Sequence, residues 1–396
     1  MSRRRIGVDA RYIQDFYHGV GRYTYELVRH LPEVDGEDTF VVFWNPDVVN
    51  TRFDMGVPLG HDRVEAVVAR VPLYAPQSQP AMAALAAKAQ LDLFHGPFFG
   101  FPLLAPCPLV LTIHDLIFER YPEYMSIRWA YLYYRLVMQL GVARARAIAV
   151  VSESTQRDLA RFYRHSRARV QVTPLAADDH FLPAGPEAIA QVRRRYDLPE
   201  DYILNVGSRR PNKNVGAIVR ALSAIRERVP HSLICVGESD PRFPDELQEA
   251  VEETGLQARA RAIGKVAEED LPAVYSAASA LVFPSLVEGF GAPVQEAMAC
   301  NCPVITSDCS SLPEAAGGAA LLVSPRDTAA LARAMERVLT DVGLAERLRR
   351  LGQGVAAKRS WRHTAELTLS LYESVLAHSG SRLMPSEVDG GALRAA

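Results

Sequence analysis

The segment from Ala280 to Val323 constrains the fold of this chain more than any other segment. It begins with a short apolar strand, Ala280 to Phe283, and continues through a glycine-bearing loop that follows Glu288. A helix is expected from about Pro293, and a second buried strand from Pro303 to Thr306. Parallel strands need a long crossover connection, usually a helix. The segment therefore predicts a strand–helix–strand unit of a parallel sheet.

The loop before this helix has the features of a phosphate-binding turn. Gly289 and Gly291 would let a ligand approach the backbone closely. We expect Ala292 at the N-cap, where it offers no side-chain acceptor, so that the amides of Val294 and Gln295 lack a local partner. Free N–H groups at the positive end of a helix attract anions.

Two glutamates bracket the loop. Glu288 could accept hydrogen bonds from hydroxyls near a bound phosphate, and Glu296, about one turn into the helix, could accept them from a ribose. A nucleotide sugar carries its sugar hydroxyls, its phosphates and its ribose in the same order. The alternative is a buried α/β turn with two surface glutamates, and the chemistry of these residues alone leaves both interpretations open.

The run from Glu288 to Glu296, EGFGAPVQE, resembles the E-x7-E signature of retaining glycosyltransferases of the GT-B class, glycosyltransferase family 4. FPS at 283–285 and SLPE at 311–314 match that family as well. The resemblance implies that Glu288 contacts the hydroxyls of the donor sugar and that Glu296 holds the ribose. It also implies that the loop residues between them contact sugar and phosphate: Gly289, Phe290, Gly291 and Val294. Ala292 and Gln295 depart from the usual leucine, which leaves these roles intact.

Composition is that of a globular enzyme. The chain has 396 residues, enough for two or three domains, and 48% of them are hydrophobic. Its net charge of −2 argues against nucleic acid as a partner. No run of apolar residues is long enough for a transmembrane helix. The segment Ile6 to Asp9 is too short and polar for a signal peptide, so we expect a cytoplasmic protein.

The five cysteines predict no metal site. Cys300, Cys302 and Cys309 lie close together in sequence, but no nearby histidine completes a set of four ligands, and a Cys-x-Cys spacing is unusual for zinc. We expect them to be reduced and buried.

Strands and helices alternate along the first half, which predicts a doubly wound, mostly parallel sheet. A second α/β domain follows a proline- and glycine-rich linker, Pro174 to Glu187.

The resemblance implies the GT-B architecture, with two Rossmann-like domains facing a central cleft and a C-terminal helix crossing back to the first domain. We expect an acceptor-binding domain at 1–178, a nucleotide-sugar domain at 188–357, the crossing helix, starting near Trp361, at 358–378, and a disordered tail at 379–396. In the first domain, strands are expected at 5–9, 39–44, 64–68, 91–95, 109–113, 147–151 and 169–173, and helices at 20–31, 78–89, 127–143 and 153–163.

Three loops at strand ends of the first domain are candidates for the site. The loop from Asp15 to Gly21 carries Gly19 and Gly21 before a helix, either as a plain turn or as an exposed helix N-terminus. The resemblance implies that this glycine loop faces the donor phosphates and the acceptor.

The second candidate is His114, which ends a buried strand. It is either a core histidine or, as the resemblance implies, a neighbour of the anomeric centre, together with Asp115.

The third loop, HGPFFG at 95–100, either packs internally or walls an acceptor pocket. The segment from Arg144 to Arg169 has seven arginines and two acidic residues. It is either a solvated helix face or a basic surface for anionic lipid head groups or a pyrophosphate-linked acceptor.

In the second domain, three cations follow a strand, Arg209, Arg210 and Lys213. Cations at a strand end could neutralise a diphosphate and stabilise it as a leaving group, or they could simply be surface charge. The resemblance assigns Lys213 and one of the two arginines to the donor diphosphate, and places Gly237 and Val266 beside the base. Asn212 is expected to cap the following helix.

The resemblance implies transfer of a hexose, with retention, from a nucleoside-diphosphate sugar to a hydroxyl of a glycan or lipid-linked acceptor. GDP-mannose is the first choice of donor, with UDP-glucose and dTDP-rhamnose as alternatives. Catalytic roles fall to His114, Lys213, Arg209 and Glu288. No cofactor and no metal are expected, and a peripheral contact with the inner membrane surface is considered. The rival functions are a nucleotide-sugar epimerase of the same fold and a binding protein without catalysis.

Overall fold

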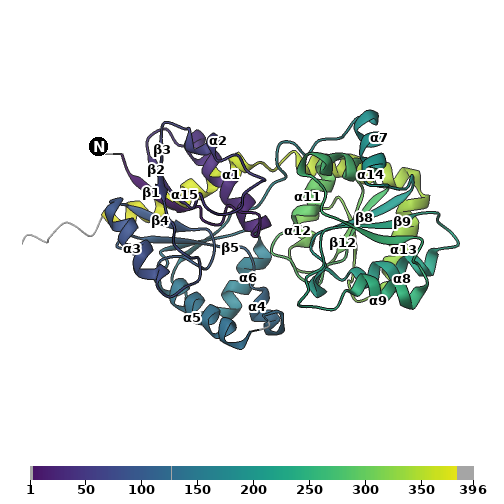
Figure 1. The fold of residues 1–396 in the computed structure, drawn as a ribbon, viewed down its shortest axis with the longest axis horizontal. Helices are drawn as coiled ribbons and strands as arrows, with labels where there is room; N and C mark the ends of the chain where they lie inside the picture. The colour runs from purple at the N-terminus through teal and green to yellow at the C-terminus, as the bar shows by residue number, and fades with distance from the viewer. Residues whose placement is uncertain (1–2, 126, 381–396) are drawn as a thin grey trace, which may run out of the picture.

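Two parallel sheets form the core of the structure, a computed structural model that describes residues 3–125 and 127–380 (Figure 1). The first sheet has seven strands in the order β3-β2-β1-β4-β5-β6-β7. The chain enters at β1, moves outward to β3, and then returns to the other side of β1. The switch point between β1 and β4 is where doubly wound sheets bind ligands, at the carboxyl ends of the strands. The strands are β1 (Arg5–Asp9), β2 (Thr39–Trp44), β3 (Val64–Val68), β4 (Leu93–Gly96), β5 (Leu109–Ile113), β6 (Ala147–Val150) and β7 (Arg169–Val172).

The second sheet repeats this topology with six strands, in the order β10-β9-β8-β11-β12-β13. The chain again enters near the centre, at β8, and its switch point lies between β8 and β11. Both strands lead into loops that carry predicted site residues. The strands are β8 (Tyr202–Val206), β9 (Ser232–Val236), β10 (Ala260–Gly264), β11 (Ala280–Phe283), β12 (Val304–Ser307) and β13 (Leu321–Val323).

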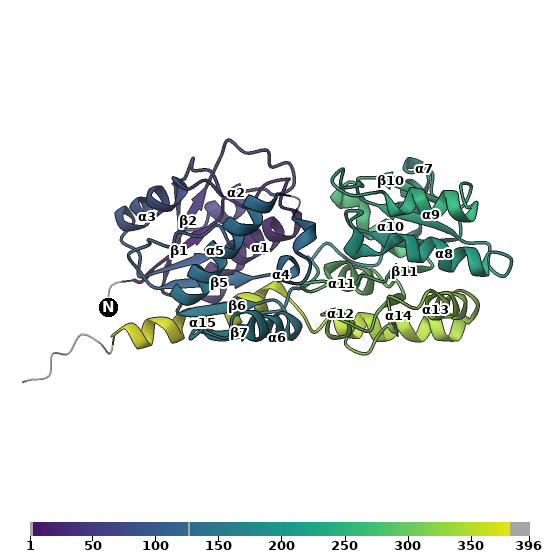
Figure 2. The ribbon, with the colours of Figure 1, turned by 90° about the horizontal axis from the view of Figure 1, so that it is seen from below.

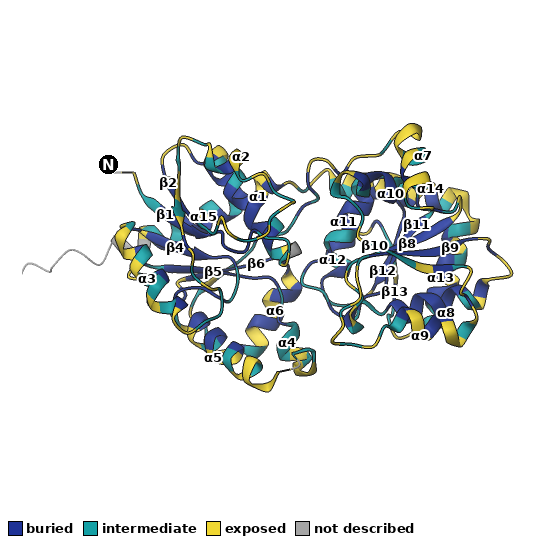
Figure 3. Ribbon diagram, in the orientation of Figure 1, coloured by how far each residue is buried: buried dark blue, intermediate teal, exposed yellow. Residues whose placement is uncertain are grey.

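Helices cover both faces of each sheet because the strands bury alternate side chains on opposite sides. In β2, Phe40 and Val42 pack on the side of α1 and α15, whereas Val41 and Phe43 pack on the side of α3 and α5. Figure 3 shows the central strands of each sheet buried, whereas the outer strands β3, β7, β10 and β13 are partly exposed. The longer helices are α1 (His18–Val34), α3 (Ser78–Lys88), α5 (Arg128–Arg144), α6 (Glu153–Phe162), α7 (Pro186–Arg195), α8 (Val215–Ile225), α9 (Glu246–Thr254), α10 (Leu271–Ala277), α11 (Ala292–Ala299), α13 (Thr328–Thr340), α14 (Val342–Ala356) and α15 (Trp361–Gly380), and the short ones are α2 (Gly56–Leu59), α4 (Ile117–Arg120) and α12 (Leu312–Ala316). Among the described helices, none has an apolar stretch of the length that a bilayer crossing requires.

The last helix returns from the second domain and packs against α1, β6 and β7 of the first (Figure 2). Trp361 donates from Nε1 to Asp178 Oδ1 over 2.8 Å at the start of this helix. Deeper in the domain, the hydroxyl of Tyr372 lies 2.6 Å from His95 Nδ1, and His95 Nε2 lies 2.8 Å from the Thr112 hydroxyl. The C-terminal helix is therefore part of the core of the first domain.

Most predicted elements are found within one or two residues of their expected ends. Asn212 does not cap α8. It lies in a short 3₁₀ turn and its side-chain amide donates to Val287 O over 3.3 Å, while Asn214 occupies the N-cap with a φ of 56°. Asn212 therefore joins the loops after β8 and β11, a long-range contact that a local capping rule does not anticipate. The helix α15 reaches Gly380, two residues into the predicted tail, and 381–396 lie outside the described residues.

We predict that Tyr372→Phe lowers the free energy of unfolding by about 1–3 kcal/mol, because buried His95 loses a hydrogen-bond partner. Urea denaturation measures this change. Tyr133→Phe, on a half-buried position of α5, is the matched control and should change it by less than about 0.5 kcal/mol. Equal effects of the two changes would contradict a structural role for the Tyr372 hydroxyl.

Candidate functional site

The loop that contains the two motif glycines lies directly against the first domain. The carbonyl of Gly289 accepts a hydrogen bond from Ser152 Oγ over 2.7 Å, at the start of α6. A Cβ at Gly289 would lie 2.2 Å from the carbonyl oxygen of His114. Only glycine permits this approach, so His114 and the loop after Glu288 meet at one point between the two sheets.

Lys213 and Glu288 form an ion pair beside that contact. Their Nζ and Oε1 atoms lie 2.6 Å apart, and both side chains are largely buried. The ammonium also lies 5.0 Å from the centre of the Phe283 ring. The two residues come from the loops after β8 and β11, the strands that flank the switch point. The structure thus brings together two residues that the sequence assigned to diphosphate and sugar.

The two candidate arginines both pair with aspartates of the segment that follows β9. Arg209 contacts Asp245 at 3.0 Å and donates to Gly237 O over 2.7 Å. Arg210, which is more exposed, contacts Asp240 at 2.9 Å. The hydrogen bond from Arg242 and the charge of Arg210 hold the pKa of Asp240 well below its usual range. Either arginine would have to exchange an aspartate for a phosphate in order to bind one.

Glu296 is buried on α11 and both of its oxygens are engaged. Oε1 lies 2.9 Å from a guanidinium nitrogen of Arg22, and Oε2 accepts a hydrogen bond from Tyr275 over 2.7 Å. Burial raises the pKa of Glu296, and the charge of Arg22 opposes that rise. Because Arg22 belongs to α1 of the first domain, the second motif glutamate is held across the domain boundary.

Arg22 also contacts two other acidic residues, Asp178 at 3.2 Å and Glu268. Glu268 is shared with Arg52, which lies at 2.8 Å. Sequence reasoning did not identify Arg22 as a site residue. The available signal was its position directly after Gly21, the last residue of a loop already considered as part of the site.

Asp178 and Glu268, together with His180, form the only cluster among the described residues with the spacing of a metal site; their ligand atoms lie within 4.8 Å of one another. Two of the three are already ion-paired with Arg22. The guanidinium of Arg22 already supplies the positive charge that a metal ion would supply. The cluster is therefore better suited to an arginine than to a metal ion.

His114 is buried at the end of β5. Its Nε2 atom lies 2.9 Å from Pro97 O, an arrangement that places the proton on Nε2. Burial lowers the pKa of His114 to about 4, so the ring is neutral at pH 7. Burial also raises the pKa of the neighbouring Asp115 to about 6, with a smaller contribution from the charge of Glu288.

Phe98 and Phe99 line an apolar pocket together with His114 and with Tyr134 and Met138 of α5. The HGPFFG loop therefore both packs internally and borders a space next to the predicted site. Gly100 of the same loop donates to the Tyr12 hydroxyl over 3.0 Å.

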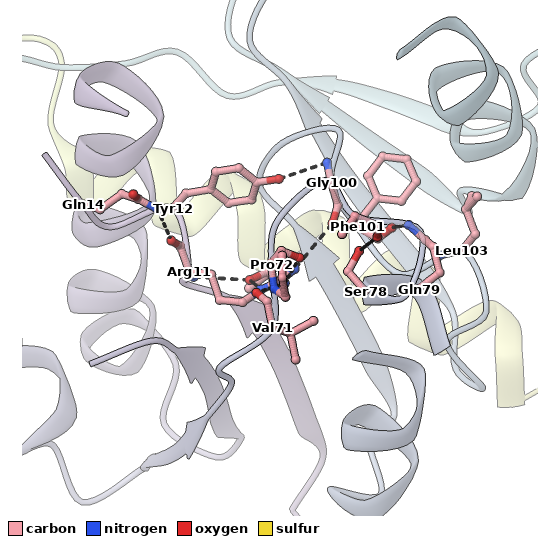
Figure 4. Close-up of polar contacts among 12 residues, drawn as sticks. Arg11, Tyr12, Gln14, Val71, Pro72, Ser78, Gln79, Gly100, Phe101 and Leu103 are labelled. Atoms are coloured by element: carbon pink, nitrogen blue, oxygen red, sulfur yellow. Dashed lines mark hydrogen bonds and ion pairs between the residues drawn. The ribbon is translucent and has the colours of Figure 1, made fainter. Parts of the chain in front are cut away.

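A buried ion pair and the contacts of Arg11 and Tyr12 beside it hold the loops on this side of the first domain together; Figure 4 shows Arg11 next to Val71, and Tyr12 next to Gly100. Arg11 contacts Asp9 at 2.6 Å, and both side chains are inaccessible. Arg11 also donates to Val71 O over 3.0 Å, while the adjacent Tyr12 accepts from Gly100. Loops that follow β1, β3 and β4 are thus tied to one another, and the sequence analysis missed this anchor.

The two glycine-rich helix starts differ from expectation. Helix α1 begins at His18, so Gly19 and Gly21 lie in its first turn and not in a loop before it. The amide of Gly21 already donates to Tyr17 O over 2.6 Å, and a Cβ there would lie 2.9 Å from Tyr12 O. Gly21 is therefore required for packing, and its amide is not free for a phosphate.

In α11 the N-cap is Gly291, with a φ of 98°, and not Ala292. The amide of Val294 donates to Gly291 O over 3.0 Å, so the prediction that it lacks a local partner was wrong. Phe290 is buried, with the guanidinium of Arg359 over its ring at 5.3 Å.

The two candidates for the base pocket lie at the edge formed by β9 and β10. Gly237 has a φ of 122°, and a Cβ there would lie 2.2 Å from Gly207 O. Its amide donates to Gly264 O over 2.8 Å, two residues before the half-buried Val266. Gly237 therefore lies against the start of the loop that carries Lys213.

Comparison with known proteins is consistent with this arrangement. Residues 17–181 match the sequence profile described as Glycosyltransferase Family 4, and residues 200–341 match Glycosyl transferases group 1. The O-antigen chain mannosyltransferase B of Escherichia coli is 30% identical over 369 residues, which are 90% of this chain and 96% of that protein. The chain belongs to glycosyltransferase family 4. It is therefore a glycosyltransferase.

Solved structures share the fold. Sucrose-phosphate synthase from Thermosynechococcus elongatus superimposes with a TM-score of 0.75 at 24% identity, over 95% of this chain and 100% of that one. The Anabaena protein HepE in complex with UDP-glucose gives 0.71 at 20% identity, over 94% and 99%. These structures confirm the predicted GT-B fold, with two parallel-sheet Rossmann-like domains.

We predict that wild-type protein loses about 2–3 kcal/mol of stability relative to His114→Gln when the pH falls from 7 to 4. The folded-state pKa of His114, about 4, lies below its ordinary value of 6.5, so its contribution is complete above pH 6.5 and is lost as the pH falls through 4. Urea denaturation at a series of pH values measures it. The exposed His165→Gln is the control, and parallel curves for wild type and His114→Gln would refute the prediction.

Proposed function

We propose that this glycosyltransferase moves a hexose, with retention of configuration, from a nucleoside-diphosphate sugar to a hydroxyl of a glycan or lipid-linked acceptor. The observation that carries the proposal is the Lys213–Glu288 pair, held where the Gly289 loop meets His114. A cation, a carboxylate and a neutral histidine converge there at the carboxyl ends of parallel strands, where such folds bind ligands.

Lys213, with Arg209 or Arg210, stabilises the departing diphosphate, an electrostatic contribution that grows as the leaving-group charge develops. Glu288 accepts hydrogen bonds from sugar hydroxyls. The bond from the anomeric carbon to the phosphate oxygen breaks, the bond to the acceptor oxygen forms on the same face, and the acceptor proton passes to the departing phosphate. No protein nucleophile and no metal take part in this scheme.

The donor diphosphate and sugar contact the backbone between Gly289 and Val294, with Gly19 and Gly21 on the opposite side. The base lies beside Gly237 and Val266. Because both oxygens of Glu296 are engaged, a ribose bound there replaces Arg22 or shares the carboxylate with it.

His114 has a positional role beside the anomeric carbon. Since burial lowers its pKa to about 4, the ring stays neutral at neutral pH. Its Nε2 proton is directed to Pro97 O, which leaves Nδ1 as the free acceptor on the ring.

GDP-mannose is the proposed donor, supported by the mannosyltransferase name of the Escherichia coli relative that matches over nearly its whole length. The same relative acts, by its name, on an O-antigen chain, which supports a polysaccharide or lipid-linked acceptor. We propose a cytoplasmic protein with peripheral contact to the inner membrane surface, where such acceptors are presented.

Lys213→Ala should lower kcat for transfer from GDP-mannose by about 10²–10³-fold, because it removes one charge that stabilises the leaving diphosphate. Release of GDP in the presence of an oligosaccharide acceptor measures the rate. The exposed Lys358→Ala is the matched control and should retain wild-type rates. If Lys213→Ala is as active as the control, this role is wrong. Conversion of the donor to an isomer without any acceptor would instead identify an epimerase.

GDP at about 100 times its dissociation constant should stabilise the native protein by about 2.7 kcal/mol, without added metal. A thermal-shift series with GDP, UDP, dTDP and ADP detects this, and the stabilising nucleotide names the base. The stabilisation should be lost in Glu296→Gln, which weakens acceptance from the ribose hydroxyls but keeps the volume of the side chain. A shift with UDP alone would overturn the proposed donor, and no shift with any nucleotide would contradict the donor site.

A further inference from the structure

The outer face of α5 carries an apolar stripe. Trp129, Leu132, Leu136 and Leu140 are 79%, 54%, 57% and 47% exposed, and Ile127, just before the helix, is 62% exposed. Their spacing of three and four residues places them on one side of the helix. The opposite side of α5 is buried against the first domain (Figure 3). Because its buried residues are also mostly apolar, α5 is apolar on two faces. We call the exposed set the α5 stripe.

Arginines predominate in the segment that carries the α5 stripe. Helix α5 contains no acidic residue and exposes Arg128 and Arg135. Residues 127–169 include arginines at 128, 135, 144, 146, 157, 161, 164, 167 and 169, against Glu153 and Asp158. Asp158 is neutralised by Arg120 at the end of α4, through two hydrogen bonds. The basic character found in the sequence therefore extends into α5.

Helix α6 lies next to α5 and exposes two further arginines, Arg157 and Arg161. Glu119 connects the two helices, since its carboxylate accepts hydrogen bonds from Tyr134 of α5 and from Tyr163, just after α6. Arg135 is exposed on α5, where its guanidinium lies 5.9 Å from the centre of the Tyr131 ring.

We propose that the α5 stripe and the arginines beside it dock this protein on a bilayer that contains anionic lipids. Helices that lie in a membrane interface combine an apolar face with arginine or lysine, and tryptophan favours the level of the head groups. Arginines near such a surface are attracted by its negative potential. A two-fold dimer through the same face would bring these arginines against their own copies, which like-charge repulsion disfavours.

The docked helix also borders the proposed site. Tyr134 and Met138, on the inner side of α5, line the apolar pocket next to His114. A lipid-linked acceptor held in the bilayer would thus be presented beside the transferase site. This last step rests on the proposed function, whereas docking itself does not.

Trp129 provides a direct probe with the full-length protein. Of the three tryptophans, Trp361 is buried and Trp44 is half-buried, so Trp129 dominates the response to a new environment. We expect vesicles of phosphatidylcholine mixed with phosphatidylglycerol to shift tryptophan emission to the blue and to protect it from iodide. Phosphatidylcholine alone should do so more weakly, and Trp129→Phe should abolish the shift.

Vesicle flotation tests the face itself. Leu132→Gln with Leu136→Gln should weaken binding by about tenfold or more, since two apolar anchors are lost. The matched control is Val57→Gln with Val342→Gln, at exposed apolar positions elsewhere, which should bind like wild type. Arg135→Gln with Arg161→Gln should weaken binding and reduce its salt dependence. Melting temperatures of all variants should match wild type, because the substituted side chains are exposed.

Absence of wild-type binding to anionic vesicles, or equal binding by both leucine and valine variants, would overturn the proposal. A second copy of the chain would be the partner if the wild-type protein does not bind vesicles but forms a concentration-dependent dimer that the leucine substitutions abolish. That result would also overturn the docking proposal. Transfer to a water-soluble acceptor separates the two proposals. The leucine variant should keep this transferase activity. A wild-type protein that binds vesicles but transfers no sugar would support docking and contradict the proposed function.

Discussion

The placement of the two domains relative to each other depends on one arginine that contacts three carboxylates. Arg22, near the start of α1, contacts Glu296, Asp178 and Glu268, which come from the linker and from the second domain. Removal of this largely buried guanidinium would leave Glu296 and Asp178 with the neutral hydrogen-bond donors Tyr275 and Trp361, and would leave Glu268 paired with Arg52. The same arginine occupies the glutamate proposed for ribose binding. The proposed ribose site would therefore couple donor binding to domain placement through one side chain.

Backbone contacts define the shape of the site as much as side chains do. Gly289 lies against the His114 carbonyl, and its own carbonyl accepts from Ser152 at the start of α6. On the far side, the buried Asp9–Arg11 pair ties three loops of the first domain together. Such contacts hold Lys213 and Glu288 next to His114 without any of these residues having to determine the fold. The side chains proposed for the reaction are therefore positioned by contacts that other residues make.

The fold could be predicted from the sequence because alternating buried strands and helices, separated by glycine and proline, carry local signals. The motif between Glu288 and Glu296 likewise marked the loop that meets the first domain. Contacts across the domain boundary could not be predicted, since Arg22 and Glu296 are far apart in sequence and no local pattern pairs them. Local rules also failed at the helix starts: Ala292 and Asn212 were expected as caps, but a left-handed glycine and a long-range hydrogen bond took precedence. The roles of the site residues themselves stay predictions.

The first domain is not continuous in the sequence. Its core includes Tyr372 and the other inward-facing residues of α15, which are made only after the whole second domain. On a ribosome, the second sheet and its helices can therefore be complete while the first sheet still lacks one covering helix. The face of that sheet that α15 covers would stay exposed until α15 has left the ribosome. The order of folding in the cell is thus expected to run opposite to the order of synthesis, with the N-terminal domain finishing last.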